Sequence, residues 1–112
     1  MQIFNRKKAL ELVDNDENLL AVLIDSFLNG NRFLREELDS FISAKRFDEA
    51  AGYVHATKGA ARQLCLEKLQ ASGQNLEDIL RGKAQGDIKT GENIMFTDYN
   101  EAVGLLKSNT PS

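Results

Sequence analysis

The residues best suited to chemistry in this sequence form the run His55-Ala56-Thr57-Lys58-Gly59-Ala60-Ala61-Arg62, which contains the only histidine. Residues three and four apart share one face of a helix, so Lys58 would lie beside the imidazole of His55. A glycine inside a helix costs about 1 kcal/mol relative to alanine, and Gly59 would leave room for a bulky partner to approach. The pattern is typical of a reactive nitrogen that carries an anionic group.

Phosphoryl transfer is a chemistry that these side chains suit. A neutral imidazole has one unprotonated ring nitrogen near neutral pH, so His55 can act as a nucleophile without an added base. Such transfer depends mainly on positioning and charge stabilisation, which an exposed imidazole and a nearby cation provide. Lys58 would hold a phosphoryl oxygen, and Arg62 would contribute at longer range. The alternatives are a surface or structural His55, a solvated Lys58, a helix-packing Gly59 and an Arg62 that is only a surface charge.

The elements that position this run are predicted to be helices, and strand signals are absent. A short first helix over about 6–13, capped by Asn5, precedes a turn at Asp14-Asn15-Asp16. Apolar residues then recur at three- and four-residue steps, which predicts one long helix, bent at Gly30. Its apolar stripe comprises Leu20, Leu23, Ile24, Phe27, Leu34, Leu38, Phe41 and Ile42.

Three further helices are expected after a break near residues 44–46, and His55 is rotated off the apolar stripe of the first of them. The three stripes comprise Phe47, Ala50, Ala51, Val54, Ala61 and Leu64; then Leu66, Leu69, Leu76, Ile79 and Leu80; and then Met95, Tyr99, Ala102, Val103 and Leu106. The economical packing is an all-α, antiparallel up-and-down four-helix bundle with a short additional N-terminal helix over one end. The last helix would complete the bundle or lie beside it.

Length and composition exclude several classes of protein. A chain of 112 residues with a net charge of −3 predicts a single domain, with a bundle core over about 16–107 and a flexible tail over 108–112, and offers no basic face for nucleic acid. Cys65 is the only cysteine and is interpreted as a packing residue. The opening residues lack a signal peptide, and no apolar segment approaches the ~20 residues of a membrane span. We therefore expect a cytoplasmic protein without membrane insertion, and the sequence holds no metal-binding cluster.

The run around His55 resembles the signature of histidine-containing phosphotransfer (HPt) domains of bacterial phosphorelays. In that signature a His-x-x-Lys-Gly motif is followed by small residues, here Ala60-Ala61, and then by an apolar residue, here Leu64. The likeness continues through the leucines downstream and through the apolar residues upstream, so it covers most of the chain. One departure is Cys65, where many members carry a glycine soon after the motif.

The resemblance implies a phosphocarrier without catalytic turnover of its own. His55 would accept a phosphoryl group from the aspartate of a response-regulator receiver domain, or donate one to it, and a hybrid sensor histidine kinase is the other implied partner. The receiver would supply the Mg²⁺, this chain would bind no cofactor, and it would act as a monomer. Two alternatives remain open: a helical bundle that regulates a kinase or receiver without carrying phosphate, and an enzyme such as a phosphohistidine-using phosphatase or transferase.

A docking face is predicted from the hairpin before His55, because counting back through the turn near Lys45 puts His55 opposite residue 35. Arg32, Phe33 and Glu36 would then lie nearby. Phe33 falls off the predicted core stripe, so it would be an exposed anchor for a transient interface. The alternative is that Phe33 packs against the side of the bundle. Acidic side chains near this face form either a solvated surface or a determinant of receiver choice: Glu36, Glu37, Asp48 and Glu49.

Overall fold

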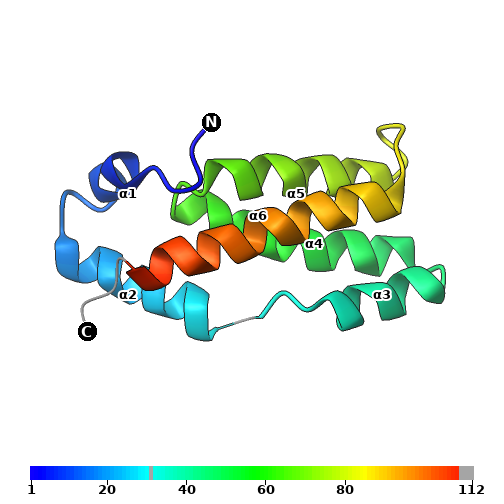
Figure 1. Cartoon of the computed structure of the whole chain (residues 1–112), viewed down its shortest axis with the longest axis horizontal. Helices are drawn as coiled ribbons and strands as arrows, with labels where there is room; N and C mark the ends of the chain where they lie inside the picture. Colours follow the sequence, from blue (N-terminus) through cyan, green and yellow to red (C-terminus); the bar gives the residue numbers. More distant parts are fainter. Residues whose placement is uncertain (31, 109–112) are drawn as a thin grey trace.

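The computed structural model describes residues 1–30 and 32–108, and these residues form helices and connecting segments without any strand. The helices are α1 (Arg6–Leu12), α2 (Glu17–Asn29), α3 (Arg35–Ser43), α4 (Phe47–Gln63), α5 (Glu67–Leu80) and α6 (Ile88–Ser108). They pack into an elongated bundle in which α2 and α3 lie end to end along one side (Figure 1). The predicted all-α helical bundle is confirmed. The predicted tail at 108–112 begins with a helical Ser108 and otherwise lies outside the described residues.

The N-terminal part follows the sequence prediction closely. The side chain of Asn5 caps α1 by accepting from the backbone N–H of Lys8. Asp14 and Asn15 both have left-handed backbone conformations, with φ of 54° and 59°, and Asp16 then caps α2. The backbone N–H of Asn5 donates to the carbonyl of Cys65 at 3.0 Å, which ties the segment before α1 to the turn between α4 and α5.

The predicted long second helix is wrong, because the chain breaks into α2 and α3. The backbone N–H of Gly30 donates to Ser26 O at 2.8 Å, and a Cβ added at Gly30 would lie only 2.4 Å from that oxygen. Only glycine fits this helix end. Tyr53 of α4 holds the link that follows, since its hydroxyl donates to Arg32 O at 3.1 Å and accepts from Leu34 N at 2.7 Å. A tertiary contact thus satisfies the backbone groups that a continuous helix would have paired internally.

The break also changes which side chains reach the core. Phe33 is 3% exposed and stacks on Phe96 with ring centroids 4.3 Å apart, whereas Leu34 is 48% exposed. The predicted exposed Phe33 and buried Leu34 are therefore both wrong, and the alternative in which Phe33 packs against the bundle holds. The physical reason is that the 3.6-residue period of α2 does not continue through an extended link to α3.

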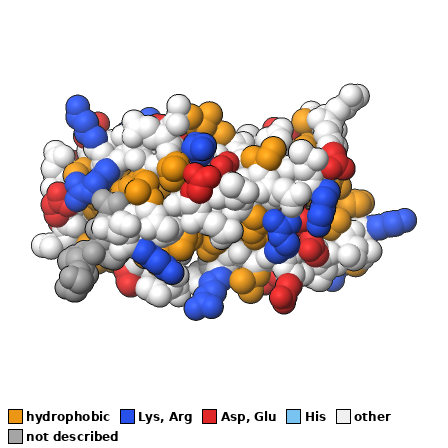
Figure 2. Space-filling view, in the orientation of Figure 1, with side chains coloured by type: hydrophobic (Ala, Val, Ile, Leu, Met, Phe, Trp, Pro, Cys, Tyr) orange, Lys and Arg blue, Asp and Glu red, His pale blue; other side chains and the backbone are white. Residues whose placement is uncertain are grey.

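The remaining helices form the centre of the bundle, where α4 packs most extensively on α5 and α5 packs on α6. The inward positions of α4 are fully buried at Ala50, Ala51, Val54 and Ala61. Phe47, which the apolar stripe predicted to face inward, is exposed in the first turn of the helix, so that prediction is wrong. Met95, Ala102 and Leu106 are also fully buried, so α6 completes the bundle. Charged side chains of both signs are interspersed over the face shown in Figure 2. No helix within residues 1–30 and 32–108 is long and apolar enough to cross a membrane.

Candidate functional site

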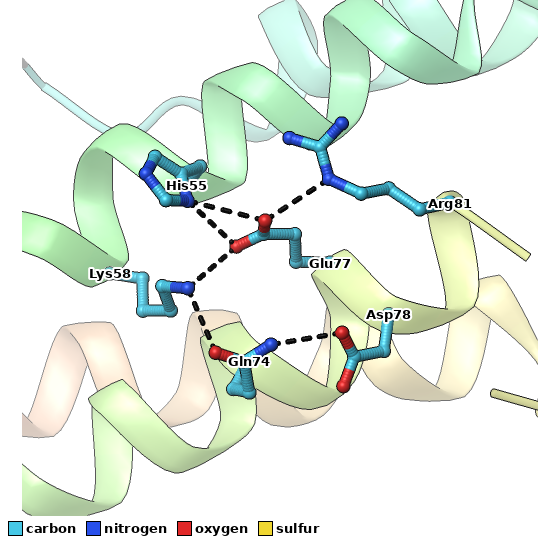
Figure 3. A network of polar contacts seen from close by, with 6 residues as sticks. All are labelled: His55, Lys58, Gln74, Glu77, Asp78 and Arg81. Atoms are coloured by element: carbon cyan, nitrogen blue, oxygen red, sulfur yellow. Dashed lines mark hydrogen bonds and ion pairs between the residues drawn. The ribbon is translucent and has the colours of Figure 1, made fainter. Parts of the chain in front are cut away.

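His55 lies in the middle of α4 with its side chain 59% exposed, on the side of that helix that faces α5. Its ring nitrogen Nδ1 lies 3.1 Å from Oε1 and 3.2 Å from Oε2 of Glu77, a residue of α5 (Figure 3). The edge of the ring that carries Nδ1 is therefore fixed against the bundle. The exposed fraction of the side chain shows that the rest of the imidazole is open to a partner.

Glu77 is the centre of a hydrogen-bonded network between α4 and α5. Its carboxylate accepts from Lys58 Nζ at 2.9 Å and from Arg81 Nε at 3.1 Å, in addition to His55. Burial by itself raises the pKa of Glu77, but the hydrogen bonds from Lys58, His55 and Arg81 more than offset it and hold the pKa at about 2. Glu77 is therefore an anion at neutral pH, although it is only 7% exposed.

The charge state of Glu77 determines the tautomer of His55. An ionised carboxylate can only accept hydrogen bonds, so Nδ1 must be the nitrogen that carries the proton. In the neutral ring, Nε2 then holds the unshared electron pair. The arrangement therefore leaves the unshared electron pair on Nε2 and directs the Nδ1 proton to the carboxylate of Glu77.

Lys58 lies where the motif predicts it, one turn after His55, but it is not a free cation. Its side chain is 6% exposed and belongs to the buried face of α4. Its Nζ donates to Gln74 Oε1 at 2.8 Å as well as contacting Glu77, and Gln74 in turn donates to Asp78. Two of the three ammonium protons are thus committed to α5.

Three glycines shape the surroundings of the site in different ways. A Cβ added at Gly59, or at Gly52 three residues before His55, would meet nothing within 4 Å, so no internal contact requires either glycine. Both lie on the exposed side of α4 near His55, because they are three residues before it and four after it. Gly73 of α5 differs, since a Cβ there would lie 3.2 Å from Cβ of Lys58. Gly73 allows the close approach of α5 that brings Glu77 to the site.

The predicted docking residues are not brought together with His55. Tyr53 faces the link that contains Arg32 and Phe33, and two residues along a helix differ by about 200°, so His55 points away from that link. Arg32 and Glu36 are exposed, but they lie outside the network around Glu77, and their docking role stays an untested prediction. Arg62 is exposed in the last turn of α4 and is also outside the network.

A shallow groove lies beside His55 on the other side of α4. It has a volume of about 260 Å³ and is lined by Ala56, Thr57 and Ala60 of α4 and by Leu23 and Phe27 of α2, among others. Ala56 is the residue directly after His55. Around the helix, the exposed Gly52 and the half-buried Gly59 lie between the imidazole and the groove. Small side chains therefore form a continuous surface from His55 to a groove with both polar and apolar lining residues.

Sequence reasoning missed Glu77, Gln74 and Arg81, although one signal for Glu77 was available. His55 and Glu77 lie eleven residues before and after Leu66, which is in the turn between α4 and α5. Counting through that turn, rather than through the earlier turn near Lys45, places residue 77 opposite His55. No group of three histidine, cysteine, aspartate or glutamate side chains in the described part of the chain is arranged to hold a metal ion.

The fold and the site together define a helical bundle that presents one exposed, tautomerically fixed histidine. Residues 22–103 match the family model of the Hpt domain, which is more than half of the chain, so the chain belongs to the histidine-containing phosphotransfer family. Members of this family carry phosphoryl groups in two-component systems and interact there with receiver domains and kinases. No curated protein and no solved structure matches the chain.

Proposed function

We propose that this chain is a histidine phosphocarrier in a multistep phosphorelay, with Nε2 of His55 as the atom that receives and releases the phosphoryl group. The observation that carries the proposal is the contact of Nδ1 with the ionised Glu77, which leaves the electron pair on Nε2 of an exposed ring. The family match supports the same conclusion. The phosphoryl group would come from the aspartate of a receiver domain, or pass to one.

Lys58 is proposed to steady the phosphoryl group without leaving the network. Its third ammonium proton is not used by Glu77 or Gln74, and it can be offered to a phosphoryl oxygen. A cation near the phosphoryl oxygens stabilises the charge that develops during transfer. Arg62 is proposed only as a longer-range cation, because it lies outside the network.

The receiver is proposed to approach over the surface of small residues between His55 and the groove. Gly52, Gly59 and Ala56 offer no bulky side chain there, and Leu23 and Phe27 give the groove an apolar wall. A shallow groove that combines apolar and polar lining residues suits a transient protein interface. The divalent cation that phosphoryl transfer requires would be bound by the acidic pocket of the receiver, as the family resemblance implies.

The test is to incubate the purified chain with a phosphorylated receiver domain and Mg²⁺, or with phosphoramidate, and to measure its intact mass. We expect one acid-labile phosphoryl group on the native chain and none on His55→Gln. Gly59→Gln serves as a matched test of close approach, since a Cβ added at Gly59 meets nothing within 4 Å. It should leave labelling by phosphoramidate unchanged and slow transfer from the receiver. Failure of the folded native chain to take up phosphate from phosphoramidate and from a broad panel of receivers would favour a regulatory bundle that does not carry phosphate.

A further inference from the structure

The carboxylate of Glu77 faces Nδ1 of His55 with both of its oxygens. Both of its oxygens lie within 3.2 Å of Nδ1, so a single N–H points at the whole carboxylate. Glu77 as a residue is only 7% exposed, so water competes weakly for its carboxylate. Removing the Nδ1 proton would leave a nitrogen lone pair facing a buried anion, which is electrostatically unfavourable.

The Nδ1 proton matters because it decides what leaves when the N–P bond breaks. In the forward step, the Nε2 electron pair forms a bond to phosphorus, and the P–O bond to the donor aspartate breaks with its electron pair going to the carboxylate oxygen. If Nδ1 keeps its proton, the phosphorylated ring is a cation. When the N–P bond later breaks, its electron pair returns to Nε2 and a neutral imidazole leaves. If Nδ1 has lost its proton, the leaving group is an imidazolide anion, which is far poorer.

We propose that Glu77 is a positioning residue that keeps Nδ1 protonated after His55 is phosphorylated, and so keeps the phosphoryl group in its readily transferred form. This inference rests on the proposed phosphocarrier function and extends it to the phosphorylated state. Glu77 thereby favours passing the phosphoryl group on over storing it. The counter-charge that stabilises the cationic ring is the Glu77 carboxylate itself.

The other charged groups around the ring do not supply this effect. Lys58 of α4 and Arg81 of α5 are cations, so they oppose a positive charge on the imidazole, and both are paired with Glu77. Asp78 reaches the network only through Gln74. Among the charged groups that contact His55 or Glu77, Glu77 is therefore the only one whose charge favours the protonated ring.

The experiment compares the native chain with Glu77→Gln after phosphorylation by phosphoramidate and removal of the reagent. Glutamine keeps the size of the side chain and an oxygen that accepts from Nδ1, but it removes the charge. Loss of the phosphoryl mass is followed from about pH 5 to about pH 9, and transfer to a receiver with Mg²⁺ is measured in parallel. We expect the pH at which the rate of phosphoryl loss is half-maximal to be about one unit lower in Glu77→Gln than in the native chain. Above both of these pH values, the N–P bond of Glu77→Gln should survive about tenfold longer.

Glu49→Gln is the matched control, because Glu49 is an exposed carboxylate on the same helix whose partner is Arg46. Its profile should coincide with that of the native chain. Coincident profiles of the native chain and Glu77→Gln would overturn the inference and leave the phosphocarrier function standing. A native chain that takes up no phosphoryl group on His55 would overturn the proposed function, and the inference with it.

A second measurement keeps the inference testable if Glu77→Gln does not fold. Because His55 is the only histidine, nitrogen-15 NMR of the phosphorylated native chain shows signals from one pair of imidazole ring nitrogens. We expect Nδ1 to retain its proton at about pH 8, one unit or more above the ordinary range of a histidine. An unprotonated Nδ1 under those conditions would overturn the inference.

Discussion

Two glutamates are buried in neighbouring helices of this bundle, and their surroundings shift their acidity in opposite directions. Glu77 of α5 is 7% exposed and Glu92 of α6 is 1% exposed. The pKa of Glu77 lies at about 2, whereas the pKa of Glu92 is raised above its ordinary value. Burial acts on both carboxyl groups in the same direction, so burial does not explain the difference.

The difference lies in the groups that face each carboxylate. Glu77 accepts hydrogen bonds from three side chains that can each carry a positive charge. For Glu92, burial raises the pKa first, Asp39 raises it further, and the cations Arg35 and Lys89 offset these effects only partly. Arg35 lies 2.9 Å from Oε1, but Oε2 is buried without a hydrogen-bond partner in the described structure. Two carboxyl groups form a hydrogen bond only when one of them is protonated, so the interaction of Glu92 with Asp39 favours a proton on one of the pair.

The sequence context of a buried acid therefore does not reveal its role. Both glutamates interrupt the apolar pattern of a helix, and each has a basic residue three or four positions away, Arg81 after Glu77 and Lys89 before Glu92. Only Glu77 meets a histidine and a buried lysine from another helix. An ionised acid beside an exposed imidazole fixes a tautomer, while an acid that shares a proton with a second acid only adjusts stability.

Among the predictions that distinguish Glu77 from Glu92, the largest expected change in the free energy of unfolding comes from removing the Glu77 side chain. Glu77→Ala leaves the ammonium of Lys58 buried beside a cavity, and breaking a buried ion pair in this way costs about 3 kcal/mol. Unfolding by urea at neutral pH measures the loss. Combining Glu77→Ala with Lys58→Met should restore a large part of it, because the uncompensated charge is then gone. A cost of Glu77→Ala below about 0.5 kcal/mol would show that the network contributes little to stability.

The next effect is the dependence of stability on pH. The pKa of Glu77 is lower in the folded chain than its ordinary value of 4.5, so its contribution is present above about pH 4.5 and is lost as the pH falls toward about 2. A shift of this size corresponds to about 3 kcal/mol. Urea unfolding at a series of acidic pH values should show a steep loss for the native chain and a shallower one for Glu77→Gln. Parallel curves for the two proteins would contradict the ionised state assigned to Glu77.

The contribution of Glu92 to the pH dependence of stability should have the opposite sign and a smaller magnitude. Its raised pKa means that its contribution is present below about pH 4.5 and is lost as the pH rises through the higher folded value. Glu92→Gln supplies an amide donor that can reach Asp39, so we expect a gain of about 1 kcal/mol near neutral pH. The gain should vanish at acidic pH. Glu36→Gln, which removes an exposed carboxylate from α3, should change stability by less than about 0.5 kcal/mol at either pH.

The sequence predicted the helical scaffold well wherever local signals dominate. Asn5 and Asp16 cap the first two helices as expected, and the small or aliphatic inward positions of α4 are buried. The α2–α3 break was not predictable from periodicity, because the apolar steps continue through Gly30. It depends on the hydroxyl of Tyr53, which holds the link from another helix. The exchange of Phe33 and Leu34 between core and surface follows from the break, because the helical period of α2 does not continue into α3.

Only the part of the candidate site that lies on α4 was predictable from the sequence. His55, Lys58 and Gly59 are recognisable because they lie within two turns of one helix. Glu77, Gln74 and Arg81 come from α5, and their approach depends on the absence of a side chain at Gly73. Lys58 could not be placed as a buried ion pair until its partner was known. The motif on α4 therefore pointed to His55, while the neighbouring helix α5 determines the tautomer of its ring.

The most direct test of this account is the tautomer of His55 in the unphosphorylated chain. The only histidine of the sequence gives one pair of imidazole nitrogen signals in nitrogen-15 NMR spectra, recorded at a pH high enough for the ring to have lost its second proton. The account predicts a protonated Nδ1 and an unprotonated Nε2, because Glu77 accepts from Nδ1. A ring protonated on Nε2 would contradict it, since neither the nucleophilic atom nor the role of Glu77 would then stand.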